Sequence, residues 1–229
     1  IWAAAVLSVL TAAVGTAGRA ETPVVVELFT SQGCSSCPPA DAILRELSDR
    51  PDVIPLALHV DYWDYIGWAD VFADPRFTDR QKAYARAAGA RMIYTPQMIV
   101  AGTDPVVGTR PMELAALIER HGAQAKRVEI ALETVGDRLR IRAETVQGGR
   151  DPCVVHVVRY RPEARVAIER GENAGRELPY SNIVTSWETV SDWDGSGVFE
   201  AEVPRGDLPV VVIVQQVGNG PILAAARLR

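Results

Sequence analysis

The sequence predicts two structural parts: an α/β layer structure over residues 21–122 and an antiparallel, β-sandwich-like part over residues 125–229. In the first part, short apolar runs that suit strands alternate with patterns that suit helices. After about Ala125, apolar and polar residues alternate at the two-residue spacing of half-buried strands. At 229 residues, the chain is long enough for two domains of ordinary size.

Residues 1–20 predict a secretory signal. Residues 1–14 are almost wholly apolar and small residues follow, with Ala17 and Ala20 as candidate cleavage positions. No basic leader precedes this run, so we expect the signal to be truncated at its start. A membrane anchor is the alternative, but the run is shorter than the roughly 18 to 20 apolar residues of a spanning helix. We therefore expect an exported protein, periplasmic or secreted, that is not attached to a membrane after cleavage.

The elements of the first part follow the order β-α-β, helical insert, β-β-α. An unbroken apolar run at 24–29 is typical of a strand that is covered on both faces. Pro38 and Pro39 suit the first turn of a helix, and apolar residues recur at helical spacing until Pro51. The later elements are expected as a strand at 53–60, an aromatic helical insert at about 61–90, strands at 97–100 and 106–107, and a helix at 111–120.

The second part is expected to consist mainly of strands. Val128, Ile130 and Leu132 alternate with polar residues, and Gly136 then marks a turn into a second alternating run. Further strands are expected at 139–143, 153–160, 210–217 and 222–228. The region Gly171–Gly197 is expected to be loop-rich.

A Cys-Ser-Ser-Cys motif, Cys34 to Cys37, lies where the first strand passes into the first helix. Two thiols at this spacing can close a small disulfide ring, and the start of a helix stabilises a thiolate. A thiolate at Cys34 could accept hydrogen bonds from the N–H groups of Ser36 and Cys37. Because Pro38 and Pro39 lack an N–H, this stabilisation is expected to be weaker than at other helix starts. The motif favours redox chemistry, with a structural disulfide and a metal site as alternatives.

The element order, this motif and Thr95-Pro96 before the third strand together resemble the thioredoxin superfamily over roughly residues 22–122. In detail, the chain resembles an exported bacterial family of unknown function that joins a thioredoxin-like domain to a β-rich C-terminal domain. The segments that carry this closer resemblance are Leu28–Pro39, Tyr94–Gln97 and Gly171–Arg176.

The resemblance implies roles for individual residues. Cys34 would be the exposed nucleophile and Cys37 the resolving thiol. Pro96 would be the cis-proline that faces them, and Thr95 would offer its backbone to a bound substrate strand. Gly33 and the Ser-Ser dipeptide differ from the Trp and Gly-Pro common in thioredoxins, so the direction of the redox reaction does not carry over.

Glu27 lies in the middle of the first apolar strand, where a carboxylate needs a partner or a proton. Thioredoxins carry a buried acid on this strand that helps to deprotonate the resolving cysteine, so the resemblance implies the same role for Glu27. An edge position, or an ion pair with Lys82 or Arg91, is the alternative.

His59 ends the second strand, which in an open α/β sheet points toward the active edge. A single histidine is more often a scaffold residue than a ligand. Together with Cys34 and Cys37, however, it could complete a three-ligand site for a soft metal such as Cu(I). Cys153, the third cysteine, is expected to be a buried free thiol.

We therefore expect an exported thiol–disulfide oxidoreductase that acts on protein thiols or disulfides and needs no dissociable cofactor. The formal charge of −5 argues against nucleic acid as a partner. The alternatives are a soft-metal-binding or metallochaperone module that uses the same cysteines, and a non-catalytic binding protein braced by a structural disulfide. The sequence does not indicate the oligomeric state.

Overall fold

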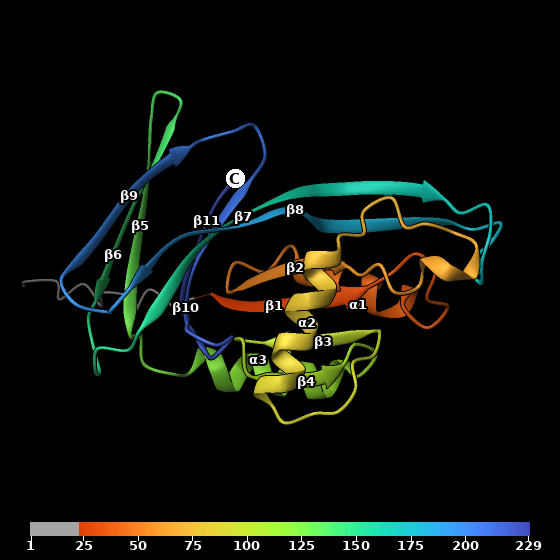
Figure 1. Cartoon of the computed structure of the whole chain (residues 1–229), viewed down its shortest axis with the longest axis horizontal. Coiled ribbons are helices and arrows are strands. Elements are labelled where there is room, and N and C mark those ends of the chain that lie inside the picture. Colours follow the sequence, from red (N-terminus) through yellow and green to blue (C-terminus); the bar gives the residue numbers. More distant parts are fainter. Residues whose placement is uncertain (1–22) are drawn as a thin grey trace, which may run out of the picture.

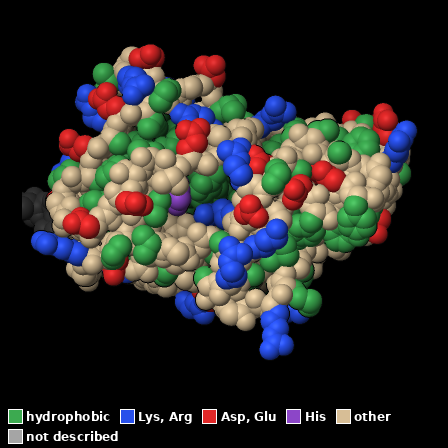
Figure 2. All heavy atoms as spheres, in the orientation of Figure 1, with side chains coloured by type: hydrophobic (Ala, Val, Ile, Leu, Met, Phe, Trp, Pro, Cys, Tyr) green, Lys and Arg blue, Asp and Glu red, His purple; other side chains and the backbone are tan. Residues whose placement is uncertain are grey.

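The computed structural model of the protein describes residues 23–229, and the expected signal at residues 1–20 lies outside them. The described chain combines a large mixed sheet, three α-helices and a second, antiparallel sheet (Figure 1). No helix among residues 23–229 has the length and apolar character needed to cross a membrane. On the face shown in Figure 2, basic and acidic side chains are interspersed rather than gathered by sign.

Four strands from the first half of the chain form one end of the large sheet, in the order β2-β1-β3-β4. They are β1 (Val24–Thr30), β2 (Val53–His59), β3 (Gln97–Val100) and β4 (Asp104–Val107). The β1 and β2 strands are parallel, in a register that pairs Val24 with Val53 and Thr30 with His59. The β3 strand is antiparallel to β1. Every residue of β1 and β2 is buried, as the unbroken apolar run predicts.

Helices cover both faces of these strands. The α1 helix (Pro38–Leu47) and the α3 helix (Pro111–Gly122) pack on the face that carries Val26 and Leu28. The α2 helix (Pro75–Ala87) packs on the opposite face, with Val25 and Phe29. Side chains alternate between the faces of a strand, so Glu27 lies on the α2 face and Thr30 on the α1 face.

The expected helical insert at 61–90 is helical only in part. Its first portion holds a single 3₁₀ turn (Asp64–Ile66), and α2 forms the second portion. Asp74 caps α2 by accepting from the Arg76 N–H, and Pro75 occupies the first helical position.

The second half of the chain contributes to both sheets. A long hairpin of β7 (Cys153–Ala167) and β8 (Glu177–Trp193), followed by β10 (Val210–Gln216) and β11 (Ile222–Leu228), completes the eight-stranded sheet. The β8 strand meets β2 at the pair Ala57 and Ile183, so strands from both halves of the chain lie in one sheet. The proposed domain boundary at residues 122–125 stays a prediction.

The second sheet consists of β5 (Val128–Val135), β6 (Arg138–Thr145) and β9 (Val198–Pro204). Its apolar face, which includes Leu139 and Ile141, packs against Val155 and Val212 of the large sheet. Two antiparallel layers therefore face each other in this half, in agreement with a sandwich-like arrangement.

The expectation of a loop-rich region at Gly171–Gly197 is wrong, because β8 occupies most of it. Apolar and polar residues do not alternate along β8, because the two parts of the strand have different neighbours. Its first part packs Leu178, Tyr180 and Ile183 beside Trp68 and Phe72 of the insert, whereas much of its second part is exposed. The β7–β8 hairpin therefore extends over the first half of the chain (Figure 1).

Candidate functional site

Cys34 and Cys37 form a disulfide in the loop between β1 and α1, which confirms the predicted ring. The loop is tightly wound: the Cys34 N–H donates to the Ser31 carbonyl, and the Cys37 N–H donates to the Cys34 carbonyl. The Cys37 carbonyl in turn accepts from the N–H groups of Ala40 and Asp41, so α1 is continuous with the motif. Strand, disulfide and helix therefore form one rigid junction.

Both cysteines are buried, with 1% of Cys34 and none of Cys37 exposed. The expectation that Cys34 is an exposed nucleophile is therefore wrong for this conformation. The insert supplies part of the cover, since a Cβ atom added to Gly33 would lie 3.1 Å from both Ile66 Cδ1 and Trp63 Cβ. The sequence does not predict this cover, because it depends on how the segment after β2 folds back.

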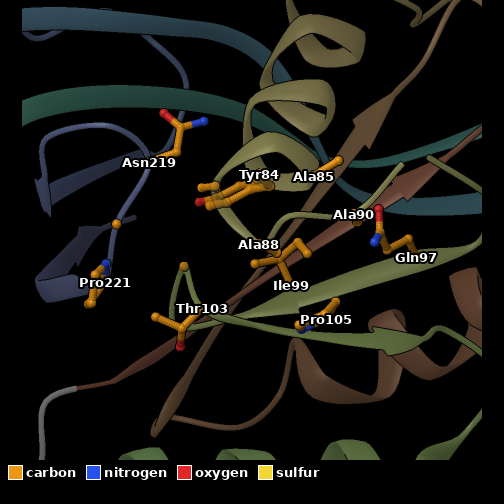
Figure 3. Close-up of a pocket in the computed structure, with 13 residues that line it drawn as sticks. Tyr84, Ala85, Ala88, Ala90, Gln97, Ile99, Thr103, Pro105, Asn219 and Pro221 are labelled. Atoms are coloured by element: carbon orange, nitrogen blue, oxygen red, sulfur yellow. The ribbon is translucent and has the colours of Figure 1, made fainter. Parts of the chain in front are cut away.

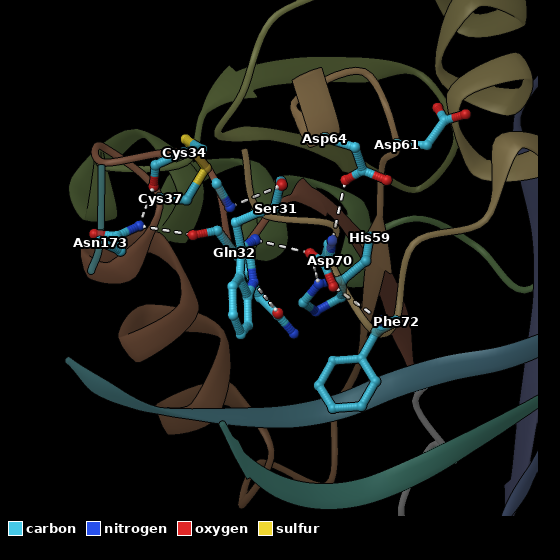
Figure 4. A network of polar contacts seen from close by, with 12 residues as sticks. Ser31, Gln32, Cys34, Cys37, His59, Asp61, Asp64, Asp70, Phe72 and Asn173 are labelled. Carbon is cyan, nitrogen blue, oxygen red and sulfur yellow. Dashed lines mark hydrogen bonds and ion pairs between the residues drawn. A yellow bond between two sulfur atoms is a disulfide. The ribbon is translucent and has the colours of Figure 1, made fainter. Parts of the chain in front are cut away.

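The tip of the β7–β8 hairpin, residues 171–176, supplies further contacts and is hereafter called the hairpin tip (Figure 4). The Asn173 side-chain amide is buried and donates to the carbonyls of Gln32 and Cys34, at 2.9 and 3.0 Å. The Glu172 carboxylate accepts from the Ser35 N–H at 3.2 Å. These contacts join two segments that are more than 130 residues apart in the sequence.

The conformation of the hairpin tip depends on its two glycines. Gly171 and Gly175 both have φ of +79°, a left-handed value that glycine adopts without steric cost. Within the tip, Arg176 donates to the Asn173 side-chain oxygen at 2.8 Å and so fixes the orientation of the amide. The segment Gly171–Arg176 is part of the family resemblance, but the sequence alone does not indicate that it contacts the disulfide loop.

Thr95 and Pro96 lie beside the same junction. The Thr95–Pro96 peptide bond is cis, as predicted. The Thr95 hydroxyl accepts from the Trp63 indole N–H at 2.7 Å. A Cβ atom added to Gly108 would lie 2.8 Å from Ala40 Cβ and 3.0 Å from Pro96 Cβ, so Pro96 is close to the first turn of α1. The role of Thr95 and Pro96 in binding a substrate strand stays a prediction.

Glu27 is not brought toward Cys37. Its carboxylate is fully buried on the α2 face and accepts from the Arg80 guanidinium at 2.6 and 3.0 Å. The Tyr84 hydroxyl donates to the same carboxylate at 2.6 Å. Since α1 lies on the other face of the sheet, the geometry does not support Glu27 as the proton acceptor for Cys37. The expected partners Lys82 and Arg91 are also wrong, because α2 presents Arg80 to the strand.

His59 is a buried residue whose partner is Asp70 rather than a cysteine. Its Nδ1 atom lies 2.7 Å from the Asp70 carboxylate, and its ring packs edge-on against Phe72 (Figure 4). The Tyr180 ring also packs edge-on against it. Burial raises the pKa of Asp70, but the interaction with His59, together with hydrogen bonds from the N–H groups of Gln32 and Phe72, outweighs it and holds this pKa below its usual value. Within residues 23–229, no three or more His, Cys, Asp or Glu side chains gather as a metal site.

Asp41 is a further acidic residue of the candidate site, and the sequence alone does not indicate its position there. Its position in the first turn of α1 is typical of an exposed acid at a helix start, yet its side chain is buried. Cys37 has helical backbone angles, so Asp41 lies one turn along the same helix face. Burial raises the pKa of Asp41 to about 7, although the nearby His59 opposes the shift.

Several polar atoms near Asp41 are buried without a hydrogen-bond partner among the described residues. Such atoms are uncommon in folded proteins. They belong to strands β1, β2 and β8, to the loop after β1 and to α1. The atoms are Thr30 Oγ1, Gln32 Nε2, Asp41 Oδ2, His59 Nε2 and Tyr180 Oη.

A separate pocket of about 250 Å³ lies between the end of α2, the β3–β4 turn and the β10–β11 turn (Figure 3). Its lining is mostly apolar and includes Ala85, Ala88, Ile99 and Pro221. Neither cysteine of the disulfide lines it, so the pocket is not part of the site around Cys34.

Comparisons with known proteins identify two solved structures that are similar to this chain. The chain is similar to a protein from Agrobacterium tumefaciens with a known X-ray crystal structure, with 32% identity over 92% of this chain and 95% of the other, and a TM-score of 0.78. It is also similar in fold to HBP35 of Porphyromonas gingivalis, with 16% identity over 91% of this chain and 75% of the other, and a TM-score of 0.62. A comparison with curated proteins found no match. The family model described as "Protein of unknown function (DUF1223)" matches residues 25–215, and the chain therefore belongs to this family.

Proposed function

We propose that the protein is an exported thiol–disulfide oxidoreductase, periplasmic or secreted, that acts on protein thiols or disulfides. The observation that carries this proposal is the Cys34–Cys37 disulfide at the junction of β1 and α1, where Pro96 lies close to the first turn of the helix. The strand order β2-β1-β3-β4, with α1 and α3 on one face and α2 on the other, supports a thioredoxin-like core. Export to an oxidising compartment fits a stable disulfide.

The chemistry is a pair of exchange steps. In the dithiol form, the Cys34 thiolate attacks one sulfur of a partner disulfide, and the other partner sulfur leaves as a thiolate. The Cys37 thiol then loses its proton and attacks Cys34 Sγ, which releases the second partner sulfur and closes the Cys34–Cys37 bond. Two electrons pass from the protein to the partner. The reverse sequence oxidises a partner dithiol, and neither direction needs a dissociable cofactor.

The burial of both sulfurs requires a local opening before a protein partner can react. Two segments hold the disulfide loop in place: the Trp63–Ile66 segment packs against Gly33, and the hairpin tip donates to the carbonyls of Gln32 and Cys34. Ser35 and Ser36, between the cysteines, are exposed. We infer that a partner first contacts the loop at these serines, and that displacement of the hairpin tip then exposes Cys34.

The test measures thiol–disulfide exchange by the folded protein. We expect the Cys34–Cys37 couple to equilibrate with a glutathione buffer under native conditions, and the protein to reduce or oxidise a model protein disulfide. Cys34→Ser should abolish this turnover, whereas Cys37→Ser should trap a mixed disulfide. Cys153→Ser is the matched control, because Cys153 is a buried free thiol far from the motif in sequence. Equal turnover in wild type and Cys34→Ser would eliminate the proposal.

The near-complete burial of both sulfurs favours a second candidate, a non-catalytic binding protein in which the disulfide braces the β1–α1 junction. This candidate predicts that the folded protein resists reduction by glutathione and that Cys34→Ser lowers its stability without affecting the binding of a partner. The exchange rate under native conditions distinguishes the two candidates.

A further inference from the structure

We propose that the redox couple is built to favour the disulfide, so that the dithiol protein acts as a reductant of protein disulfides. Glu172 in the hairpin tip is the positioning residue that contributes to this bias. The inference rests on the proposed exchange activity and supplies its direction, which the resemblance to thioredoxins does not indicate.

The first observation concerns the donors around Cys34. A dithiol couple becomes a strong oxidant when its thiolate is stabilised, which hydrogen bonds at a helix start usually achieve. Here the Cys37 N–H is already bonded to the Cys34 carbonyl, and the Ser35 N–H is bonded to Glu172. Pro38 and Pro39 have no N–H to donate. Among residues 35–39 of the described chain, the donors that remain for a thiolate at Cys34 are the Ser36 N–H and the Ser36 hydroxyl, whose oxygen lies 3.4 Å from Cys34 Sγ.

The second observation is the burial of both sulfurs. A neutral disulfide tolerates an environment shielded from water better than a thiolate does, because burial disfavours the charged form. With 1% of Cys34 and none of Cys37 exposed, a thiolate formed in this conformation would be shielded from water. Reduction therefore yields two neutral thiols, without the ionisation of Cys34 that favours the dithiol in an oxidising couple.

The third observation is the charge of the hairpin tip. The Glu172 carboxylate accepts from the N–H of the residue directly after Cys34, so a negative charge lies against the backbone of the motif. Arg176 is the basic residue of the tip, and its guanidinium donates to Asn173. On the helix side, Asp41 lies one turn from Cys37. Like charges disfavour each other, so the Glu172 carboxylate opposes a thiolate at the motif, and Asp41 does so in its ionised form.

A protein that reduces the disulfides of its partners must itself be reduced again after each reaction. After the dithiol protein has reduced a partner disulfide, its own Cys34–Cys37 bond is closed and must be opened again. The reaction that supplies it is therefore a second exchange, in which a dithiol of another exported or membrane-held reductant transfers two electrons to this protein.

The experiment measures the equilibrium constant of the couple in a glutathione buffer at neutral pH. We expect wild type to be more reducing than the glutathione couple. Glu172→Gln should move the equilibrium about threefold to tenfold toward the dithiol, which is about 15 to 30 mV, and the Cys34 thiol should ionise at lower pH. The effect should shrink at high salt, since Glu172 is exposed.

Glu169→Gln is the matched control, because it removes the same charge from an exposed position near the same hairpin turn. Equal shifts in Glu172→Gln and Glu169→Gln, or no shift in either, would overturn the role of Glu172. A wild-type couple more oxidising than glutathione would overturn the direction while leaving the exchange activity intact. A folded protein whose disulfide does not exchange at all would instead remove the proposed function, and this inference with it.

Discussion

Replacing Asp41 with asparagine should stabilise the folded protein at neutral and higher pH. The substitution keeps the size and shape of the side chain but removes a carboxyl that is buried on α1. Asp41 Oδ2 has no hydrogen-bond partner among the described residues, and the nearby His59 and Thr30 offset only part of the cost of removing the ionised form from water. Asparagine carries no charge at any pH and therefore avoids this cost.

The size and pH dependence of the effect follow from the titration of Asp41. In the unfolded chain the carboxyl has a pKa near 3.8, and burial raises the pKa of Asp41 in the folded protein to about 7, with His59 opposing the shift. Between these two values the folded state holds the proton more tightly, so the stability contributed by Asp41 falls as pH rises. At about 1.36 kcal/mol per pKa unit, the cost above pH 7 reaches at most about 4 kcal/mol. Below about pH 4 the carboxyl is protonated in both states and the cost vanishes.

The assay is urea unfolding, followed by tryptophan fluorescence with the disulfide intact, at about pH 4, 6 and 8. We expect the free energy of unfolding of Asp41→Asn to exceed that of wild type by about 2 to 4 kcal/mol at the highest pH and to match it at the lowest. Asp49→Asn, which removes a charge from an exposed position just after α1, should give a small difference that does not vary in this way. A pH-independent difference for Asp41→Asn, or a loss of stability at pH 8, would refute the reasoning.

Three further substitutions test the contacts that hold the site. Arg80→Met leaves the Glu27 carboxylate buried without its ion pair, so it should destabilise the fold by about 3 to 5 kcal/mol in urea unfolding, and adding Glu27→Gln should restore part of the loss. Asn173→Ala removes two hydrogen bonds to the disulfide loop, so dithiothreitol should reduce the folded protein faster than wild type; an unchanged rate would contradict the role of the hairpin tip as cover. Gly108→Ala places a Cβ atom 2.8 Å from Ala40 Cβ, which should lower stability by about 1 to 3 kcal/mol. Gly149→Ala, where the added atom meets nothing within 4 Å, should have little effect on the melting temperature.

The sequence predicts the first half of the fold well because its elements are bounded by strong local signals. The apolar run of β1 and the prolines at the starts of α1 and α3 each fix an element by its own composition. The β8 strand lacks such a signal. One part of it packs on the insert while much of the remainder is exposed, so its burial pattern reflects long-range packing and not a local period.

The candidate site is predicted only where its residues are close in sequence. The spacing of Cys34 and Cys37 predicts their disulfide, and the family motif predicts the cis bond at Pro96. The local sequence does not reveal which face of a strand an acid occupies relative to a helix. For this reason Glu27 is the expected acid near Cys37, whereas the structure places Asp41 on that side of the sheet.

The hairpin tip gives the second half of the chain a direct part in the site. Asn173 and Glu172 contact the carbonyls and the N–H of the disulfide loop, and Gln215 of β10 donates to Tyr84, which holds Glu27. The chain after residue 150 therefore contacts both the disulfide loop and the α2 face of β1. Because the cover over Cys34 comes partly from this half, the access of a partner to the disulfide depends on the β7–β8 hairpin. A protein with the same Cys-Ser-Ser-Cys loop but no such hairpin would present a more open disulfide, with the Ser35 N–H available to a thiolate at Cys34.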